Sequence, residues 1–258
     1  MLISLTKRGW HAHVALLKQK ASAGDISAIV ELGLNLLEGI QDRKGRSIVR
    51  RNPRAAVAYL LQAADGGDGT AACSLGYAYD VGLGVRPNSR EAKRWYRRAA
   101  RGGYATAATN LATVYRDAGK ARVAFQWWKQ AADMGDGDAA VDVGYCYQYG
   151  IGTRKSAADA RRMYRRAINS ESITEYGREA AMYHLAIQFV DHGKKSLAIP
   201  LLERAAADND FSEATTVLGQ IQTDADYVPC RCRRFIKKTA RGHTRCALHN
   251  LQNRSENK

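Results

Sequence analysis

The chain has 258 residues, of which 45% are hydrophobic and 25% are charged, and its formal net charge is +15 at pH 7. This composition is typical of a folded protein and argues against intrinsic disorder. No apolar run reaches the roughly 18 residues that a transmembrane helix needs, so we expect no membrane span. The positive charge allows an acidic partner but carries no information about the fold.

The first residues do not form a signal peptide, because Lys7, Arg8 and two histidines stand where its apolar core would lie. We therefore expect a cytoplasmic protein with reduced thiols. Residues 10–25 have the pattern of the second helix of a hairpin whose first helix is absent. Residues 1–24 are predicted to be a half-repeat that caps the first apolar face of a repeat array.

A two-helix pattern over residues 69–103 organises the chain. Its first half places Ala71, Leu75 and Tyr79 at four-residue intervals, which puts them on one face of a helix. Glycines then interrupt the period, Ser89 is the predicted N-cap of the next helix, and a second apolar stripe follows. Neither helix can bury its stripe alone, so the pair needs neighbours to stack on.

The same pattern recurs along the chain. Each first helix carries a large apolar residue followed by a small residue in most copies, with an alanine four positions earlier, at Leu32, Leu75, Leu111, Val143, Leu185 and Leu218. The second helices align on Ala63, Ala99, Ala131, Ala167 and Ala205, at spacings of 36, 32, 36 and 38 residues. Such a period predicts stacked helical hairpins. Alanine and glycine at these positions let two helix backbones approach closely.

Residues 69–103 resemble the Sel1-like repeat, a relative of the tetratricopeptide repeat. The residues that carry the resemblance are Ala71, Leu75, Gly76, Tyr79, Gly82, Gly84, Val85, Ala92, Trp95, Tyr96, Ala99, Ala100 and Gly103. The resemblance extends over residues 12–222. It implies an all-α fold, with a right-handed α-solenoid of about five helical hairpins over residues 25–227. It also implies a non-enzymatic scaffold or adaptor that binds other proteins.

The first helices of such a solenoid line its concave surface, and here they are rich in tyrosine. Tyrosine gives a large contact area at a low entropic cost, so it suits a binding surface. We predict that Tyr77, Tyr145 and Tyr149 contact a protein or peptide partner. The tyrosines at the repeat position of Tyr79 are expected in the core instead.

Several segments depart from the repeat. The turn of the first hairpin contains a basic insertion with Arg43, Lys44, Arg46, Arg50, Arg51 and Arg54. An extra segment, residues 169–177, is expected to bend the solenoid, and Pro200 is expected to delay or kink its helix because proline lacks a backbone donor. The arginine clusters of residues 90–101 and 161–166 have two interpretations, a solvated outer face or a surface for an anionic partner.

The C-terminal region differs from the repeats. We predict a small basic Cys/His module over residues 228–250 and a disordered tail over 251–258. Cys230, Cys232, Cys246 and His249 are four donors whose spacing could close around one tetrahedral Zn²⁺, which would be structural because no position stays open. A redox pair formed by the first two cysteines, or unrelated thiols in a flexible tail, are the alternatives.

The same region offers an alternative function, because residues 230–258 contain nine Lys or Arg and a single acid. A nucleic-acid-associated protein would contact phosphates through Arg231, Arg233, Arg234, Lys237, Lys238, Arg241 and Arg245. An enzyme is the weakest hypothesis, because no phosphate loop, nucleophile elbow or zinc-protease motif is present in the sequence. The aspartates at residues 133–142 are interpreted as helix caps rather than a calcium loop.

Overall fold

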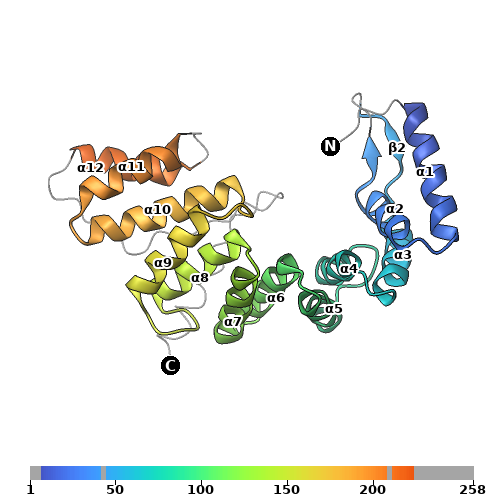
Figure 1. The fold of residues 1–258 in the computed structure, drawn as a ribbon, viewed down its shortest axis with the longest axis horizontal. Helices are drawn as coiled ribbons and strands as arrows, with labels where there is room; N and C mark the ends of the chain where they lie inside the picture. Colours follow the sequence, from blue (N-terminus) through green and yellow to red (C-terminus); the bar gives the residue numbers. More distant parts are fainter. Residues whose placement is uncertain (1–6, 42–44, 208–210, 224–258) are drawn as a thin grey trace. The chain divides into compact units, whose positions relative to one another are not determined.

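The structure is a computed structural model that describes residues 7–41, 45–207 and 211–223 (Figure 1). The chain divides within α6 into two compact units, residues 1–111 and 112–258. The first unit contains α1 (Lys7–Ser22), α2 (Ile26–Glu38), β1 (Ile40–Gln41), β2 (Ser47–Val49), α3 (Pro53–Asp65), α4 (Gly69–Val81), α5 (Ser89–Arg101) and the start of α6 (Ala105–Asp117). The second contains the rest of α6, then α7 (Ala121–Asp133), α8 (Gly137–Tyr149), α9 (Ala157–Ile168), α10 (Glu175–Asp191), α11 (Lys195–Ala206) and α12 (Ser212–Thr223).

Consecutive helices pack as hairpins, and each hairpin stacks on the next one of its unit. In the first unit α2 pairs with α3 and α4 with α5, while α3 packs against α4. In the second unit α8 pairs with α9 and α10 with α11, while α7 packs on α8 and α9 on α10. The predicted fold class, an all-α solenoid of about five helical hairpins, is confirmed for the described residues. Ahead of the first hairpin, α1 packs against α2.

Side-chain caps explain where the helices begin. The first helices α2, α4 and α8 follow Asp25, Asp68 and Asp136, whose carboxylates accept a backbone N–H three residues on at 3.2, 2.7 and 2.9 Å. The second helices α3, α5 and α9 follow Asn52, Asn88 and Ser156. The predicted cap Ser89 is therefore wrong by one residue, because Asn88 accepts from the backbone N–H groups of Arg90 and Glu91.

The core lies between the two helices of each hairpin and between neighbouring hairpins. Gly76 in α4 faces the ring of Tyr96 in α5, and a Cβ at Gly76 would lie 2.4 Å from that ring. In the equivalent hairpin of the second unit, a Cβ at Gly144 would lie 2.6 Å from Tyr164. Both tyrosines are almost fully buried. The prediction that small residues permit close helix packing is confirmed at these two positions.

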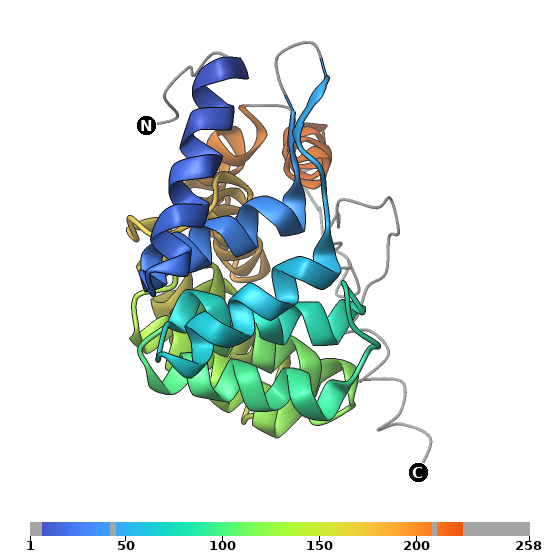
Figure 2. The ribbon, with the colours of Figure 1, turned by 90° about the vertical axis from the view of Figure 1, so that its right-hand side faces the viewer.

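The basic insertion of the first hairpin forms a short antiparallel ribbon that the sequence did not indicate. Ile40 of β1 pairs with Val49 of β2, and Gln41 pairs with Ser47. Along β2 burial increases from the exposed Ser47 to the buried Val49. The ribbon stands beside α1, as Figures 1 and 2 show. The insertion is therefore an ordered part of the first unit where it is described.

Two expectations about the fifth hairpin need correction. Helix α11 begins at Lys195 and runs through Pro200, so its start is not delayed, while the alternative expectation of a kink at Pro200 stays a prediction. Pro200 and Ser196 are both exposed, so water can reach the Ser196 carbonyl that loses its intrahelical partner. The extra segment before α10 ends earlier than predicted, because residues 175–177 belong to the helix. Thr174 caps α10 and also donates its hydroxyl to Asp138 at 2.7 Å.

Candidate functional site

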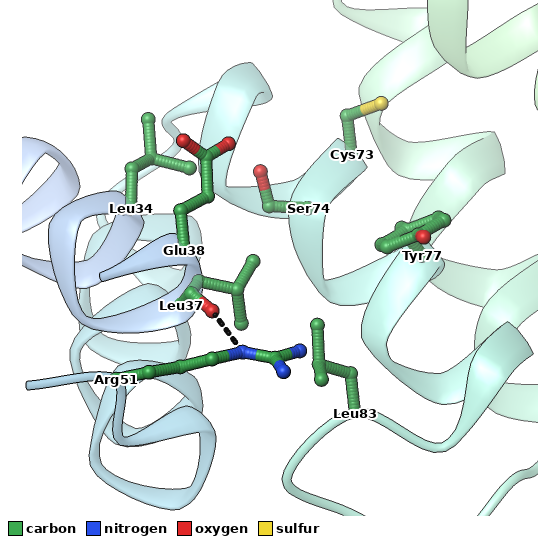
Figure 3. Close-up of a pocket in the computed structure, with 8 residues that line it drawn as sticks. All are labelled: Leu34, Leu37, Glu38, Arg51, Cys73, Ser74, Tyr77 and Leu83. Carbon is green, nitrogen blue, oxygen red and sulfur yellow. Dashed lines mark hydrogen bonds between the residues drawn. The ribbon is translucent and has the colours of Figure 1, made fainter. Parts of the chain in front are cut away.

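The first unit contains an open cavity of about 510 Å³ between α2 and α4 (Figure 3). Its lining comes from α2, α4, the residue after the ribbon and the α4–α5 turn: Leu34, Leu37, Glu38, Arg51, Cys73, Ser74, Tyr77 and Leu83. This volume falls within the usual range of roughly 300–1,000 Å³ for ligand pockets. The cavity lies on the side of the first helices, the side on which the sequence placed the binding surface.

Arg51 reaches the cavity because the ribbon returns the chain to the end of α2. Its Nε donates to the carbonyl of Leu37 at 3.0 Å, and the next residue, Asn52, donates its backbone N–H to the carbonyl of Leu36 at 2.7 Å. These two bonds satisfy carbonyls that would otherwise have no partner at the C-terminus of α2. A cation at this end also interacts favourably with the helix dipole. The end of the guanidinium group points toward Leu83 in Figure 3.

The walls of the cavity are mainly apolar. Leu37 is buried, Leu34 and Leu83 are partly buried, and Tyr77 leaves 45% of its surface exposed. Burial raises the pKa of the Cys73 thiol to about 11, although a hydrogen bond from Asn110 opposes the shift. The thiol is therefore protonated at neutral pH and is a poor nucleophile. Cys73 is therefore not a candidate nucleophile of this cavity.

The three predicted contact tyrosines have different environments. Tyr77 lines the cavity of the first unit, whereas Tyr145 and Tyr149 lie in the second unit, 4.4 Å apart between ring centroids. Tyr145 is only 9% exposed and packs edge-on against His184, so its role as a surface contact is not supported by its position. Tyr149 is partly buried. At the repeat position, Tyr115 is buried, while Tyr79 and Tyr147 are partly buried.

The neighbours of Tyr145 form a buried polar cluster in the second unit. Gln148 accepts the hydroxyl of Tyr164 at 2.7 Å, and the amide of Gln188 lies 3.3 Å from the same oxygen. The imidazole of His184 stacks on Tyr164 at 5.5 Å, and desolvation lowers its pKa to about 3. His184 is 2% exposed, so no substrate can reach it. This cluster belongs to the core and is no catalytic site.

Several arginines of α5 and α9 have partners within their own units. Arg98 lies 3.4 Å from Asp65 and Arg94 lies 3.1 Å from Glu91, and both guanidinium groups also lie over the ring of Trp95. In the second unit the equivalent cross-helix pair is that of Arg166 and Asp133, 3.2 Å apart. These contacts favour the interpretation of the two helices as a solvated outer face.

The predicted zinc ligands Cys230, Cys232, Cys246 and His249 lie outside the described residues. The same holds for the predicted phosphate contacts Arg231, Arg233, Arg234, Lys237, Lys238, Arg241 and Arg245. Within residues 7–41, 45–207 and 211–223, no three His, Cys, Asp or Glu side chains gather to hold a metal ion. Asp136 caps α8 as predicted. None of the described helices is long and apolar enough to cross a bilayer.

Tyr77 and the basic insertion both stand out in the sequence, but no local pattern shows that they lie together. Leu34, Leu37 and Leu83 looked like ordinary repeat residues, and Glu38 carried no signal at all. The insertion is the sequence feature that could have indicated the site, because among the described hairpins only the first contains it. Arg51, which enters the cavity, lies at the end of the insertion, directly before the α3 cap Asn52.

A family model described as Sel1 repeat matches residues 26–68, 69–104, 107–136 and 137–172, more than half of the chain. The first, second and fourth matches cover the hairpins α2–α3, α4–α5 and α8–α9. The hairpin of α10 and α11 lies beyond the last match. Among curated proteins, none matches this chain in sequence.

Among the solved structures that are similar to this one, two share the repeat architecture over most of this chain. The protective antigen c5321 of uropathogenic Escherichia coli strains, which displays an SLR fold, is 22% identical, with a TM-score of 0.71 over 83% of this chain and 44% of its own. A Sel1 repeat protein from Oxalobacter formigenes is 24% identical, with a TM-score of 0.62 over 77% of this chain and 79% of its own. The chain thus spans less than half the length of the Escherichia coli protein. Both likenesses show a shared fold.

Proposed function

Because the chain belongs to the Sel1 repeat family, whose members generally act as scaffolds for protein interactions, we propose that it is a non-enzymatic adaptor that binds a protein partner. The observation that carries this proposal is the open cavity between α2 and α4, with Tyr77 at its edge. Core tyrosines of the repeat are buried or partly buried, whereas Tyr77 exposes 45% of its surface. Aromatic residues with this exposure are common anchors of protein interfaces.

A photo-crosslinking experiment tests the adaptor proposal. Tyr77 is replaced by the photoreactive p-benzoylphenylalanine, and the full-length protein is irradiated in cells. We expect discrete cross-linked products that contain a second protein. The matched control places the same group at Leu197, which is 51% exposed on α11. If both positions give the same products, or neither gives any, the cavity is not where a protein partner binds.

The C-terminal region supports two further proposals. We propose that Cys230, Cys232, Cys246 and His249 hold a structural Zn²⁺, on the strength of their spacing alone. Zinc content after exhaustive dialysis tests this, and we expect about one equivalent per chain, falling on Cys246→Ser substitution. Less than about half an equivalent would contradict the zinc site. A cytoplasmic location is part of the same proposal, because thiolate ligands need a reducing compartment.

The alternative function is nucleic-acid binding through the basic residues of this region. Its support is the charge of residues 230–258, with nine Lys or Arg against one acid. Replacement of Arg231, Arg233, Arg234, Lys237, Lys238, Arg241 and Arg245 by glutamine in the full chain should abolish salt-sensitive binding in a mobility-shift assay. Absence of any binding by the unaltered chain at low salt would rule against this alternative.

A further inference from the structure

We infer that the cavity between α2 and α4 recognises a partner segment in which a carboxylate side chain stands next to a large apolar side chain. This inference rests on the proposed function, because it assumes that the cavity holds part of a protein. It adds the chemistry of the bound segment. Three features of the first unit carry it: the fixed guanidinium group of Arg51, the positive charge around it, and the apolar walls.

Arg51 presents a preorganised donor to the cavity. Its Nε is occupied by the Leu37 carbonyl at 3.0 Å, which fixes the plane of the guanidinium group. Its two terminal nitrogens remain as donors, and among the described residues no carboxylate forms an ion pair with them. Glu38 lines the same cavity, but in Figure 3 its carboxylate points away from Arg51. A planar guanidinium group with free terminal N–H groups matches a carboxylate in two parallel hydrogen bonds.

The surroundings of Arg51 are also positive. Arg50, Arg54 and Arg86 are exposed and form no ion pair with another described residue. The α4–α5 turn lies on the start of α3, since a Cβ at Gly84 would be 2.8 Å from the backbone nitrogen of Arg54. The arginines of α3 and of the turn therefore share one edge of the unit with Leu83. Among the described residues that line the cavity Glu38 is the one acid, so the edge with Arg51, Arg54 and Arg86 attracts a negative segment more than a positive one.

The apolar part of the cavity selects a neighbouring side chain. Leu34, Leu37, Tyr77 and Leu83 line it, and its volume of about 510 Å³ exceeds that of a single large side chain. An acidic residue alone would leave these walls in contact with water. A segment with Leu, Met or Phe beside Asp or Glu would cover them and reach Arg51 at the same time.

The site is a property of this chain rather than of the repeat. Arg51 is delivered by the β1–β2 ribbon, and among the described hairpins only the first has such a ribbon. The α8–α9 turn of the second unit carries Arg154 and Lys155 but no insertion that folds back on α8. Replacement of Arg154 is therefore a matched control, because it also removes one exposed arginine from a turn but not from the cavity.

Selection from a random peptide display library on the full-length protein tests the inference, followed by fluorescence anisotropy with the best labelled peptide. We expect enriched peptides to contain Asp or Glu within two residues of Leu, Met or Phe. Arg51→Gln should weaken binding about tenfold, and Arg154→Gln should leave it unchanged. Glu38→Gln should strengthen binding about threefold, because it removes a negative charge that repels the carboxylate of the bound peptide.

The outcomes separate this inference from the proposed function. Enriched peptides that lack acidic residues, or equal affinity for the unaltered protein and for Arg51→Gln, would overturn the inference and leave the adaptor proposal standing. Failure to enrich any peptide would count against both. Because Arg51 also supports the end of α2, the stability of its variant is compared with that of the unaltered protein by thermal unfolding. If that variant is unfolded, the Glu38→Gln result decides, and weaker or unchanged binding overturns the inference.

Discussion

Gly76 shows how a single side-chain position sets the spacing of a hairpin. With no Cβ, it lets α4 approach the ring of Tyr96 on α5, where a methyl group would lie 2.4 Å from ring carbon Cδ1. Gly144 has the same relation to Tyr164 in the second unit, at 2.6 Å from Cε1. Because both rings are almost fully buried, neither can move aside without disturbing its neighbours.

Gly76→Ala should therefore destabilise the protein by about 1–3 kcal/mol through overpacking, even though alanine is the better helix former. Urea unfolding followed by circular dichroism measures the effect. The control is Gly219→Ala in α12, where a Cβ would meet nothing within 4 Å. That change should be neutral or stabilise by up to about 1 kcal/mol. Equal effects of the two substitutions would contradict the close contact.

His184 makes stability depend on pH. Burial lowers its pKa to about 3 in the folded state, whereas an unfolded histidine titrates near pH 6.5. The unfolded state therefore binds the proton more readily. The contribution of the neutral His184 to the free energy of unfolding is complete above pH 6.5 and is lost as the pH falls from 6.5 toward 3. The expected slope is about 1.4 kcal/mol per pH unit in this window. Urea unfolding between pH 7.5 and 5 measures it.

The control for this pH effect is His184→Phe, which keeps an aromatic ring next to Tyr164 but cannot titrate. Its stability should change less over the same pH range, and the difference between the two curves isolates the histidine. Parallel curves would show that His184 takes up its proton in the folded state as easily as in the unfolded one.

At the level of elements, the hairpins α2–α3, α4–α5 and α8–α9 share their start signals, and the last two also share a turn contact. Aspartate caps α2, α4 and α8, and Asn or Ser caps α3, α5 and α9. The second glycine of the Gly-x-Gly turn, Gly84 or Gly152, has a positive φ and lies against the start of the preceding second helix. A Cβ there would lie 2.3 Å from the carbonyl oxygen of Pro53 or Ala121.

Asp68→Ala should destabilise the first unit by about 1 kcal/mol, because the N–H of Ala71 loses its side-chain acceptor at 2.7 Å. Thermal unfolding measures the change. Asp65→Ala, three residues earlier, is the control, since it removes an exposed ion pair with Arg98 at 3.4 Å. That pair should contribute less than about 0.5 kcal/mol. A larger effect at position 65 than at 68 would show that the cap is not the stronger contact.

The local character of these signals explains which elements could be predicted. Helix periodicity, the alanine spacing and the capping residues depend on neighbours within about one turn, so they can be read along the chain. The β1–β2 ribbon could not, because its pairing depends on contacts with α1 and on the return of Arg51 to Leu37, fourteen residues away. The late start expected for α11 did not occur, although Pro200 lies inside the helix.

On the scale of the molecule, the chain forms two compact units whose boundary falls inside α6. In repeat proteins each hairpin contacts only its neighbours, so a local defect need not spread through the whole array. The described contacts follow this rule, since the helix pairs of each unit are near neighbours along the chain.

Hydrogen exchange measured by mass spectrometry should show this division. In Gly76→Ala, exchange should accelerate in peptides of α4 and α5 and in their neighbours of the first unit. Peptides of α8 to α11 should keep their protection, because opening free energies vary among cooperative segments. Gly144→Ala should give the reverse pattern. A uniform increase over both units would show that the chain unfolds as one cooperative body.

The sequence by itself determined the class of the fold and its repeat, because stacking requires small and large apolar residues at helical spacing, and this spacing is visible in one dimension. It also located Tyr77 and the basic insertion. Only the tertiary structure decided that Arg51 lies in a cavity beside Tyr77 and Leu83, and that Tyr145 is buried against His184. Those outcomes depend on how separate elements pack, and burial and proximity between distant residues leave no local pattern.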